Sequence, residues 1–141
     1  MTDPRPAPRR VLIVEDDDDV RASLHVVLED DGWAVSLAPD GEAALEALRA
    51  EPGAFAVVLV DLMMPRLGGV GLLGRKAQDP AIAAVPVVVV SAIVDRVQLP
   101  DTGDVRAVLQ KPVSIAALLD AVRHAAGGPS GARPATGLPR A

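Results

Sequence analysis

The chain of 141 residues contains no cysteine, which excludes a disulfide framework and any site built on a thiolate. Aromatic residues are almost as scarce, with one Trp, one Phe and no Tyr, so Val, Leu, Ile and Ala must fill the core. A net charge of -5 argues against a nucleic-acid surface. No apolar run approaches the roughly 20 residues that span a bilayer, and Glu15 ends the first run too early for a signal peptide. We therefore expect one soluble, cytoplasmic domain without a nucleic-acid or membrane partner.

What the chain does contain is a short apolar run that ends in a carboxylate. Residues 57–60 are all apolar, three of the four are β-branched, and Asp61 follows at once. Such a run without alternation is typical of a strand that is buried on both faces of a parallel sheet. Pro65, Gly68 and Gly69 indicate a loop after it. The pattern predicts that Asp61 lies at the carboxyl end of a central strand, where open α/β sheets place their ligands.

Strand and helix patterns alternate along the rest of the chain. Further apolar runs indicate strands at residues 10–14, 33–37, 85–90 and 105–109. Apolar residues recur at helical spacing in residues 17–31, 40–48, 69–78 and 114–126. Strands that alternate with helices predict an α/β fold, in which a doubly wound, five-stranded parallel sheet carries helices on both faces.

Three segments lack a clear pattern. Between the fourth and fifth strands, Pro100 cannot donate a helical hydrogen bond and Thr102-Gly103 adds a further break, so at most residues 93–98 are helical. The fourth helix is therefore predicted to be short or irregular. Residues 1–9 and 127–141 are rich in proline or in Gly, Pro and Ala, and we expect disordered tails there around a single domain at residues 10–126.

The polar residues of interest all follow strand ends. Glu15 and Asp16 follow the first strand, Asp61 the third, Ser91 the fourth and Lys111 the fifth. In a doubly wound sheet these ends converge on one crevice. Three carboxylates in one crevice repel each other unless a cation joins them, and oxygen-only ligands favour Mg²⁺. A lysine and a hydroxyl beside the metal suit a phosphoryl group.

Plainer interpretations of the same residues remain open at this point. The acids at positions 15–19 also suit a helix start, and an Asp at a strand end is common as a cap or turn residue. Ser91 and Lys111, taken singly, are more often surface residues. A calcium loop of the EF-hand type is excluded because its spaced acids, Gly and final Glu are absent. His25 and His124 have no partner at ligand spacing, and we interpret both as surface residues.

Four motifs in order resemble those of response-regulator receiver domains. They are Val14-Glu15-Asp16, Asp61 with Met64-Pro65, Ser91-Ala92 and Lys111-Pro112, and the resemblance covers residues 10–126. It implies a flavodoxin-like sheet of strand order 2-1-3-4-5. It also implies a stand-alone regulator of two-component signalling that relays phosphoryl groups, and that is not a turnover enzyme. The partners implied are a histidine kinase or phosphotransfer protein, and a downstream protein target that the sequence does not name.

The resemblance also implies a role for each site residue. Asp61 would be the phosphoacceptor, whose carboxylate attacks a phosphohistidine. Ser91 and Lys111 would bind the phosphoryl oxygens. The Mg²⁺ ligands implied are the carboxylates of Glu15, Asp16 and Asp61 and the backbone carbonyl of Met63.

The chain departs from the family pattern at two positions outside the irregular fourth helix. Gly68 stands where the family usually has Asp, and Val108 stands where it often has the Phe or Tyr that reports phosphorylation. These departures favour one rival, a pseudo-receiver that binds proteins without being phosphorylated. A second rival is a phosphatase of the aspartyl-phosphate type, which needs a second Asp two residues after the nucleophile as acid and base. Met63 occupies that place and has no titratable group.

Overall fold

The structure of the protein, a computed structural model, describes residues 9–62, 68–92 and 104–127. Strands and helices alternate through most of this part of the chain. The elements are β1 (Arg10–Val14), α1 (Asp18–Asp30), β2 (Ala34–Ala38), α2 (Gly41–Ala50), β3 (Phe55–Asp61), α3 (Gly69–Ala77), β4 (Val87–Ser91), β5 (Val105–Gln110) and α4 (Ile115–Ala125).

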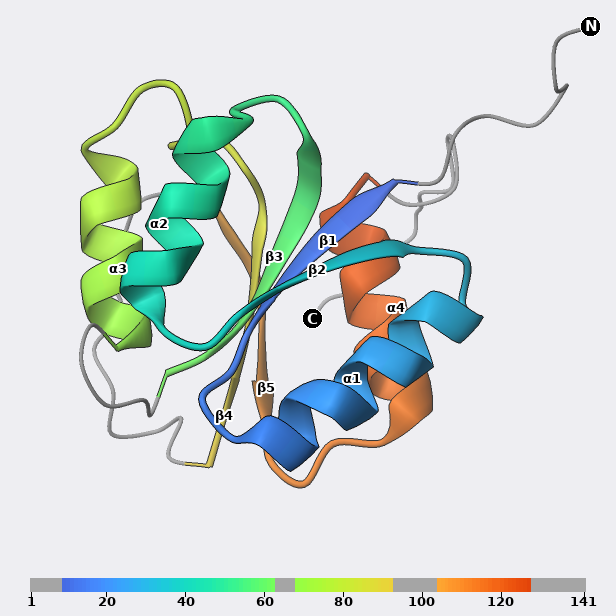
Figure 1. Ribbon diagram of the computed structural model, residues 1–141. Helices are drawn as coiled ribbons and strands as arrows, with labels where there is room; N and C mark the ends of the chain where they lie inside the picture. Colours follow the sequence, from blue (N-terminus) through green and yellow to red (C-terminus); the bar gives the residue numbers. More distant parts are fainter. Residues whose placement is uncertain (1–8, 63–67, 93–103, 128–141) are drawn as a thin grey trace, which may run out of the picture.

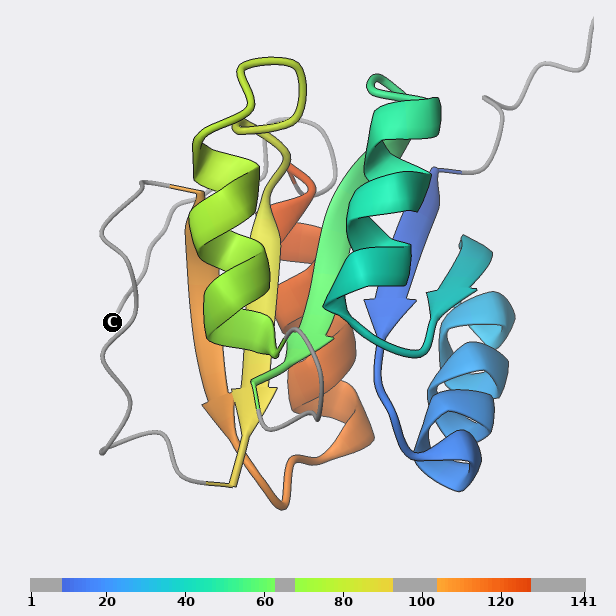
Figure 2. The ribbon, with the colours of Figure 1, turned by 60° about the vertical axis from the view of Figure 1, so that its left-hand side comes forward.

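The strands form one parallel sheet in the order β2-β1-β3-β4-β5, which confirms both the predicted fold class and the strand order. Helices α1 and α4 lie on one face of the sheet, and α2 and α3 lie on the other (Figures 1 and 2). Each face has its own apolar cluster, which joins side chains of the strands to those of the two covering helices. The central strands are therefore buried on both faces, as their unbroken apolar runs predict.

Short polar side chains begin three of the four described helices. The carboxylate of Asp17 accepts hydrogen bonds from the amides of Asp19 and Val20 at 2.9 and 3.1 Å and so caps α1. Asp40 caps α2 and Ser114 caps α4 in the same way. Each cap satisfies a backbone amide that has no partner within its helix. Because the caps directly follow loops at the carboxyl edge of the sheet, they also fix where the residues of that edge lie.

Strand boundaries differ from the predicted ones by one or two residues. Trp33 does not belong to β2, since its amide donates to the carbonyl of Leu28 at the end of α1 at 3.1 Å. β4 begins at Val87 and not at position 85. Pro86 has no amide to donate to a strand ladder, although its carbonyl accepts from Val58 at 2.8 Å. The predicted helical segment at residues 93–98 lies outside the described residues. Among the residues that are described, no helix has both the length and the hydropathy needed to span a membrane.

Candidate phosphoacceptor site

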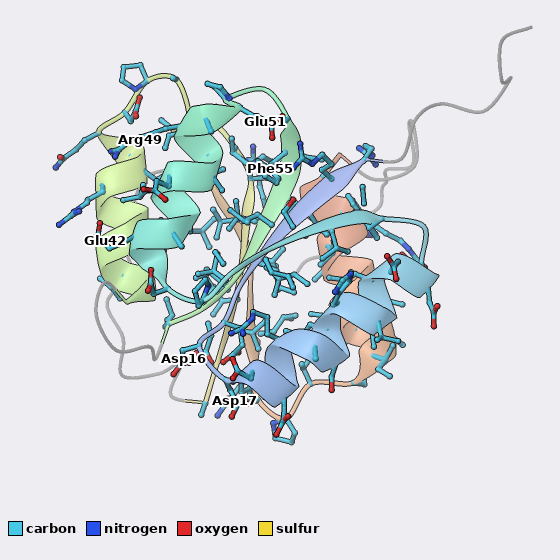
Figure 3. All side chains as sticks on the ribbon, viewed as in Figure 1. Asp16, Asp17, Glu42, Arg49, Glu51 and Phe55 are labelled. Atoms are coloured by element: carbon cyan, nitrogen blue, oxygen red, sulfur yellow. The ribbon has the colours of Figure 1, made fainter. Side chains whose placement is uncertain are left out.

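The carboxyl edge of the sheet brings the predicted site residues together. Glu15 directly follows β1, Asp61 is the last residue of β3, Ser91 the last of β4, and Lys111 directly follows β5. Figure 3 labels Asp16 and Asp17 at this edge, and Glu51 and Phe55 at the opposite edge of the sheet. Parallel strands deliver all their carboxyl ends to one side, which is why residues far apart in the sequence meet here.

Three carboxylates form a compact cluster at this edge. One carboxylate oxygen from each of Glu15, Asp16 and Asp61 lies within 4.8 Å of the others. Glu15 is 4% exposed and Asp61 is 7% exposed, whereas Asp16 lies nearer the solvent. Carboxylate oxygens this close together, one of them from a residue nearer the solvent, suit Mg²⁺, which takes few protein carboxylates and keeps several waters.

Lys111 supplies the positive charge of the site. Its Nζ donates to Oδ2 of Asp61 at 2.8 Å and lies 3.9 Å from Oε1 of Glu15. Burial would lower the pKa of Lys111, but the hydrogen bond and charge of Asp61, together with the charges of Glu15 and Asp16, raise it above its usual value. Lys111 is therefore a permanent ammonium group that contacts the carboxylate of Asp61.

The cluster is electrostatically unbalanced, and Glu15 shows it. Burial raises the pKa of Glu15 from 4.5 to about 7, and the charge of Asp61 adds to the rise. The amide of Asp17, which donates to Oε2 of Glu15 at 3.1 Å, and the charge of Lys111 oppose that rise. Glu15 thus keeps its proton near neutral pH chiefly because it is buried, and a cation bound beside it and Asp61 would favour its ionised form.

Ser91 occupies the neighbouring strand end. It is fully buried, and it follows Val90, which is the partner of Asp61 in the β3–β4 register. Its carbonyl accepts a hydrogen bond from the amide of Lys111 at 3.0 Å, so the backbone joins the two predicted phosphoryl ligands. The predicted carbonyl ligand of Met63 lies outside the described residues.

Two further residues support the site and were not predicted from the sequence. Arg21, on the first turns of α1, donates from Nη1 to the carbonyl of Glu15 at 2.8 Å and so holds the backbone after β1. Gly69 begins α3 so close to β3 that an added Cβ would lie 2.7 Å from Cα of Leu62. Only glycine fits there without movement of the backbone that follows Asp61. In the sequence Gly69 indicates a loop, and the structure adds this packing role.

A cleft of about 480 Å³ opens beside Asp61 on the face of the sheet that α1 and α4 cover. Its walls are largely aliphatic, and Asp61, Glu15 and Lys111 lie among its lining residues. The carboxylate of Asp61, the predicted acceptor, can therefore be reached through this cleft although Asp61 is nearly buried. By contrast, His25 lies 3.6 Å from Glu29 on α1 and His124 is exposed on α4, which agrees with their interpretation as surface residues.

Comparison with known proteins settles the family. The model of the response regulator receiver domain matches residues 11–123. The chain belongs to this family. Receivers are the phosphoryl-accepting modules of two-component signalling and bind Mg²⁺ at an acidic pocket, and this chain has an acidic cluster formed by Glu15, Asp16 and Asp61.

Individual relatives agree with this assignment. The transcriptional regulatory protein CseB of Streptomyces coelicolor is 43% identical over 89 residues, which are 63% of this chain and 36% of that protein. The chain thus matches only about a third of the length of that relative. A sensor protein from Polaromonas sp. JS666 has a crystal structure with a TM-score of 0.74 at 29% identity, covering 86% of this chain and 98% of that one.

A third relative has the same fold at lower identity. It is the receiver domain of the sensor histidine kinase PA1611 from Pseudomonas aeruginosa PAO1, with a TM-score of 0.73 at 22% identity, covering 86% of this chain and 100% of that chain. The crystal structure of that protein contains a magnesium ion coordinated in its active-site cleft.

Proposed function

We propose that this receiver takes a phosphoryl group from a phosphohistidine onto Asp61 in a Mg²⁺-dependent phosphorelay. The observation that carries the proposal is the contact between Lys111 Nζ and Asp61 Oδ2 at 2.8 Å, within a cluster of three carboxylates. The single positive charge of Lys111 does not neutralise three carboxylates. A divalent cation bound to the same cluster would balance the remaining negative charge.

The chain's own residues suggest how the transfer proceeds. A carboxylate oxygen of Asp61 attacks the phosphorus, an acyl phosphate bond forms, and the bond from phosphorus to the imidazole nitrogen breaks. The imidazole leaves with the electron pair of that bond. Lys111, which donates to Asp61 before the transfer, then donates to one phosphoryl oxygen, and the hydroxyl of Ser91 donates to another. Glu15, Asp16 and Asp61 would hold Mg²⁺, which would neutralise charge on the phosphoryl oxygens.

The partners and the location belong to the same proposal. The donor is a histidine kinase or a phosphotransfer protein, and the acyl phosphate then passes on its signal to a downstream protein target. The protein is not a turnover enzyme, since each chain is itself the phosphorylated product. A cytoplasmic location is part of the proposal, because such donors obtain their phosphoryl group from cytoplasmic ATP. Stand-alone action remains a prediction from the sequence.

The sharpest test uses a phosphate mimic and a small donor. Beryllofluoride with Mg²⁺ is expected to bind the wild-type chain and to fail with Asp61→Ala, as measured by calorimetry. Phosphoramidate is expected to add one phosphoryl group, seen as a mass increase that Asp61→Asn abolishes. Uptake that survives Asp61→Asn would assign the acceptor to another residue. A wild-type chain that binds neither reagent would favour the pseudo-receiver, whose support is Val108 at the usual aromatic position.

A further inference from the structure

A second lysine–aspartate contact lies far from the phosphoacceptor, inside the molecule. Lys76, near the end of α3, donates from Nζ to Oδ2 of Asp104 at 2.5 Å and to the carbonyl of Ala83 at 2.9 Å. The side chains of Lys76 and Asp104 are 0% and 2% exposed. The contact joins three segments of the amino edge of the sheet, namely the end of α3, the turn before β4 and the residue that directly precedes β5.

An irregularity in the sheet lies beside this contact. Val87 of β4 pairs with Val105, but the next residue, Val88, pairs with Ala107. Arg106 is therefore an extra residue in β5, which is a β-bulge. The bulge reverses the alternation of the strand: Val105 packs in the cluster beneath α2 and α3, whereas Ala107 packs in the cluster beneath α1 and α4.

The reversal decides which way Lys111 points. Ala107, Leu109 and Lys111 alternate regularly after the bulge, Leu109 packs beneath α1 and α4, and Lys111 lines the cleft on that face. Without the extra residue, each side chain after Val105 would turn to the opposite face of the sheet, because a one-residue slip of a strand inverts its faces. The ammonium group of Lys111 would then leave Asp61.

β5 has only one neighbour among the described strands, so pairing fixes its register from one side alone. Its start is held at Asp104. The carbonyl of this residue accepts from the amide of Val87 at 2.8 Å, and its carboxylate is held by Lys76. At the other end of the strand, the amide of Lys111 donates to the carbonyl of Ser91 at 3.0 Å. The bulge lies between these two anchors, next to the first one.

We propose that Lys76 and Asp104 are positioning residues for Lys111: they hold the entry to β5 so that the extra residue stays at Arg106 and the strand presents Lys111 to Asp61. The inference rests on the proposed function for its consequence in phosphoryl transfer, but its structural part stands independently. Neither residue touches the phosphoacceptor, and both act through the register of one edge strand.

A double-mutant cycle on the full chain separates this role from a merely structural one. Lys76→Met combined with Asp104→Leu replaces the pair by apolar side chains, a change that often leaves a fold equally stable. The cycle combines this replacement with Lys111→Ala and is repeated with Lys76→Gln plus Asp104→Asn, which removes both charges together, in case the apolar pair folds poorly. Leu73→Val, on the same buried face of α3, is the matched control for general loosening. The readouts are the rate of uptake from phosphoramidate with Mg²⁺ and the hydrogen exchange of the Lys111 amide.

If the pair positions Lys111, its replacement slows uptake by about tenfold or more, since small displacements of a reacting group are costly. The same replacement then has no further effect in the Lys111→Ala background, and the Lys111 amide exchanges faster although the melting temperature is near that of wild type. Leu73→Val changes neither uptake nor this amide.

Effects that multiply in the cycle, or an unchanged rate, would overturn the inference, because a structural role does not depend on Lys111. If the wild-type chain takes up no phosphoryl group and binds no beryllofluoride, it is the proposed function that fails. Exchange of the Lys111 amide then decides the inference alone: lost protection in the variants supports it and unchanged protection refutes it.

Discussion

Two lysines in this molecule donate to an aspartate Oδ2, at opposite edges of the same sheet, and they differ in solvent exposure and in the charge around them. Lys111 is 35% exposed and faces Glu15, Asp16 and Asp61, so negative charge is in surplus. Lys76 is fully buried and pairs with Asp104, so the contact joins one positive and one negative charge, and the positive charge of Arg106 also acts on Lys76. Burial lowers the pKa of Lys76, and the hydrogen bond to Asp104 only partly opposes this, whereas the surplus acid raises the pKa of Lys111.

The difference shows how charge balance distinguishes a ligand-binding site from a structural ion pair. A buried pair of one cation and one anion needs no ligand to balance its charge. Removing either partner destabilises the fold, because the other charge is then buried without compensation. An unbalanced cluster that solvent can reach is stabilised when it binds a cation, and a phosphoryl group can then approach. The same lysine–aspartate contact therefore indicates binding chemistry at one edge and fixed geometry at the other.

The largest expected effect comes from removing the negative charge of Asp61. Asp61→Asn is expected to abolish phosphoryl uptake, since no nucleophilic carboxylate remains. Without Mg²⁺ the variant should unfold at the same or a higher temperature, because like-charge repulsion with Glu15 is relieved. Mass spectrometry after phosphoramidate treatment and thermal unfolding without metal measure the two parts. A marked loss of stability would mean that the Asp61–Lys111 contact is structural, like the buried one.

Breaking the balanced pair is expected to affect stability instead. Asp104→Asn leaves the ammonium group of Lys76 buried without its counter-charge, and the free energy of unfolding should fall by about 3–5 kcal/mol. Lys111→Met is the matched change at the other edge. It removes a partly exposed lysine, and its cost should stay below about 1 kcal/mol. Urea unfolding of both variants checks the contrast, and equal losses would contradict it.

A backbone change at the carboxyl edge is expected to have an intermediate effect. Gly69→Ala places a Cβ 2.7 Å from Cα of Leu62 and should destabilise the fold by about 1–3 kcal/mol, with slower uptake because Leu62 follows Asp61. Gly74→Ala is the control in the same helix. An added Cβ there meets nothing within 4 Å, so the better helix former should stabilise by up to about 1 kcal/mol. Similar losses for both would show that helix α3 tolerates no side chain at either position.

Much of the site could be predicted because parallel topology is simple. Once apolar runs are assigned to parallel strands, residues that follow them must meet at one edge, and Glu15, Asp61, Ser91 and Lys111 do meet there. The family resemblance added the strand order and the residue roles. Element boundaries were less certain, since the amide of Trp33 belongs to the end of α1 although its neighbours belong to a strand.

The buried pair and the bulge could not be predicted for physical reasons. Residues 105–109 read equally well as a regular strand, because a bulge depends on what its neighbour offers and not on its own composition. Lys76 follows Leu72 and Leu73 at helical spacing, so its place on the apolar stripe was a signal of burial. Nothing local identifies a partner 28 residues away, however, and Asp104 resembled any loop acid.

The smallest expected effect is a pH dependence that only the unbalanced edge can show. Burial raises the pKa of Glu15 to about 7 in the folded protein, above its ordinary value of 4.5. The folded metal-free protein thus holds this proton more tightly than the unfolded chain. The stability that this adds is complete below about pH 4.5 and is lost as the pH rises through about 7.

Mg²⁺ needs the ionised carboxylate, so its affinity should rise by about tenfold between pH 6 and pH 8. Calorimetric titration with Mg²⁺ measures the slope. Glu15→Gln should flatten it, whereas Gly74→Ala, away from the carboxylates, should leave it unchanged, and a flat wild-type profile would mean that Glu15 is already ionised at pH 6.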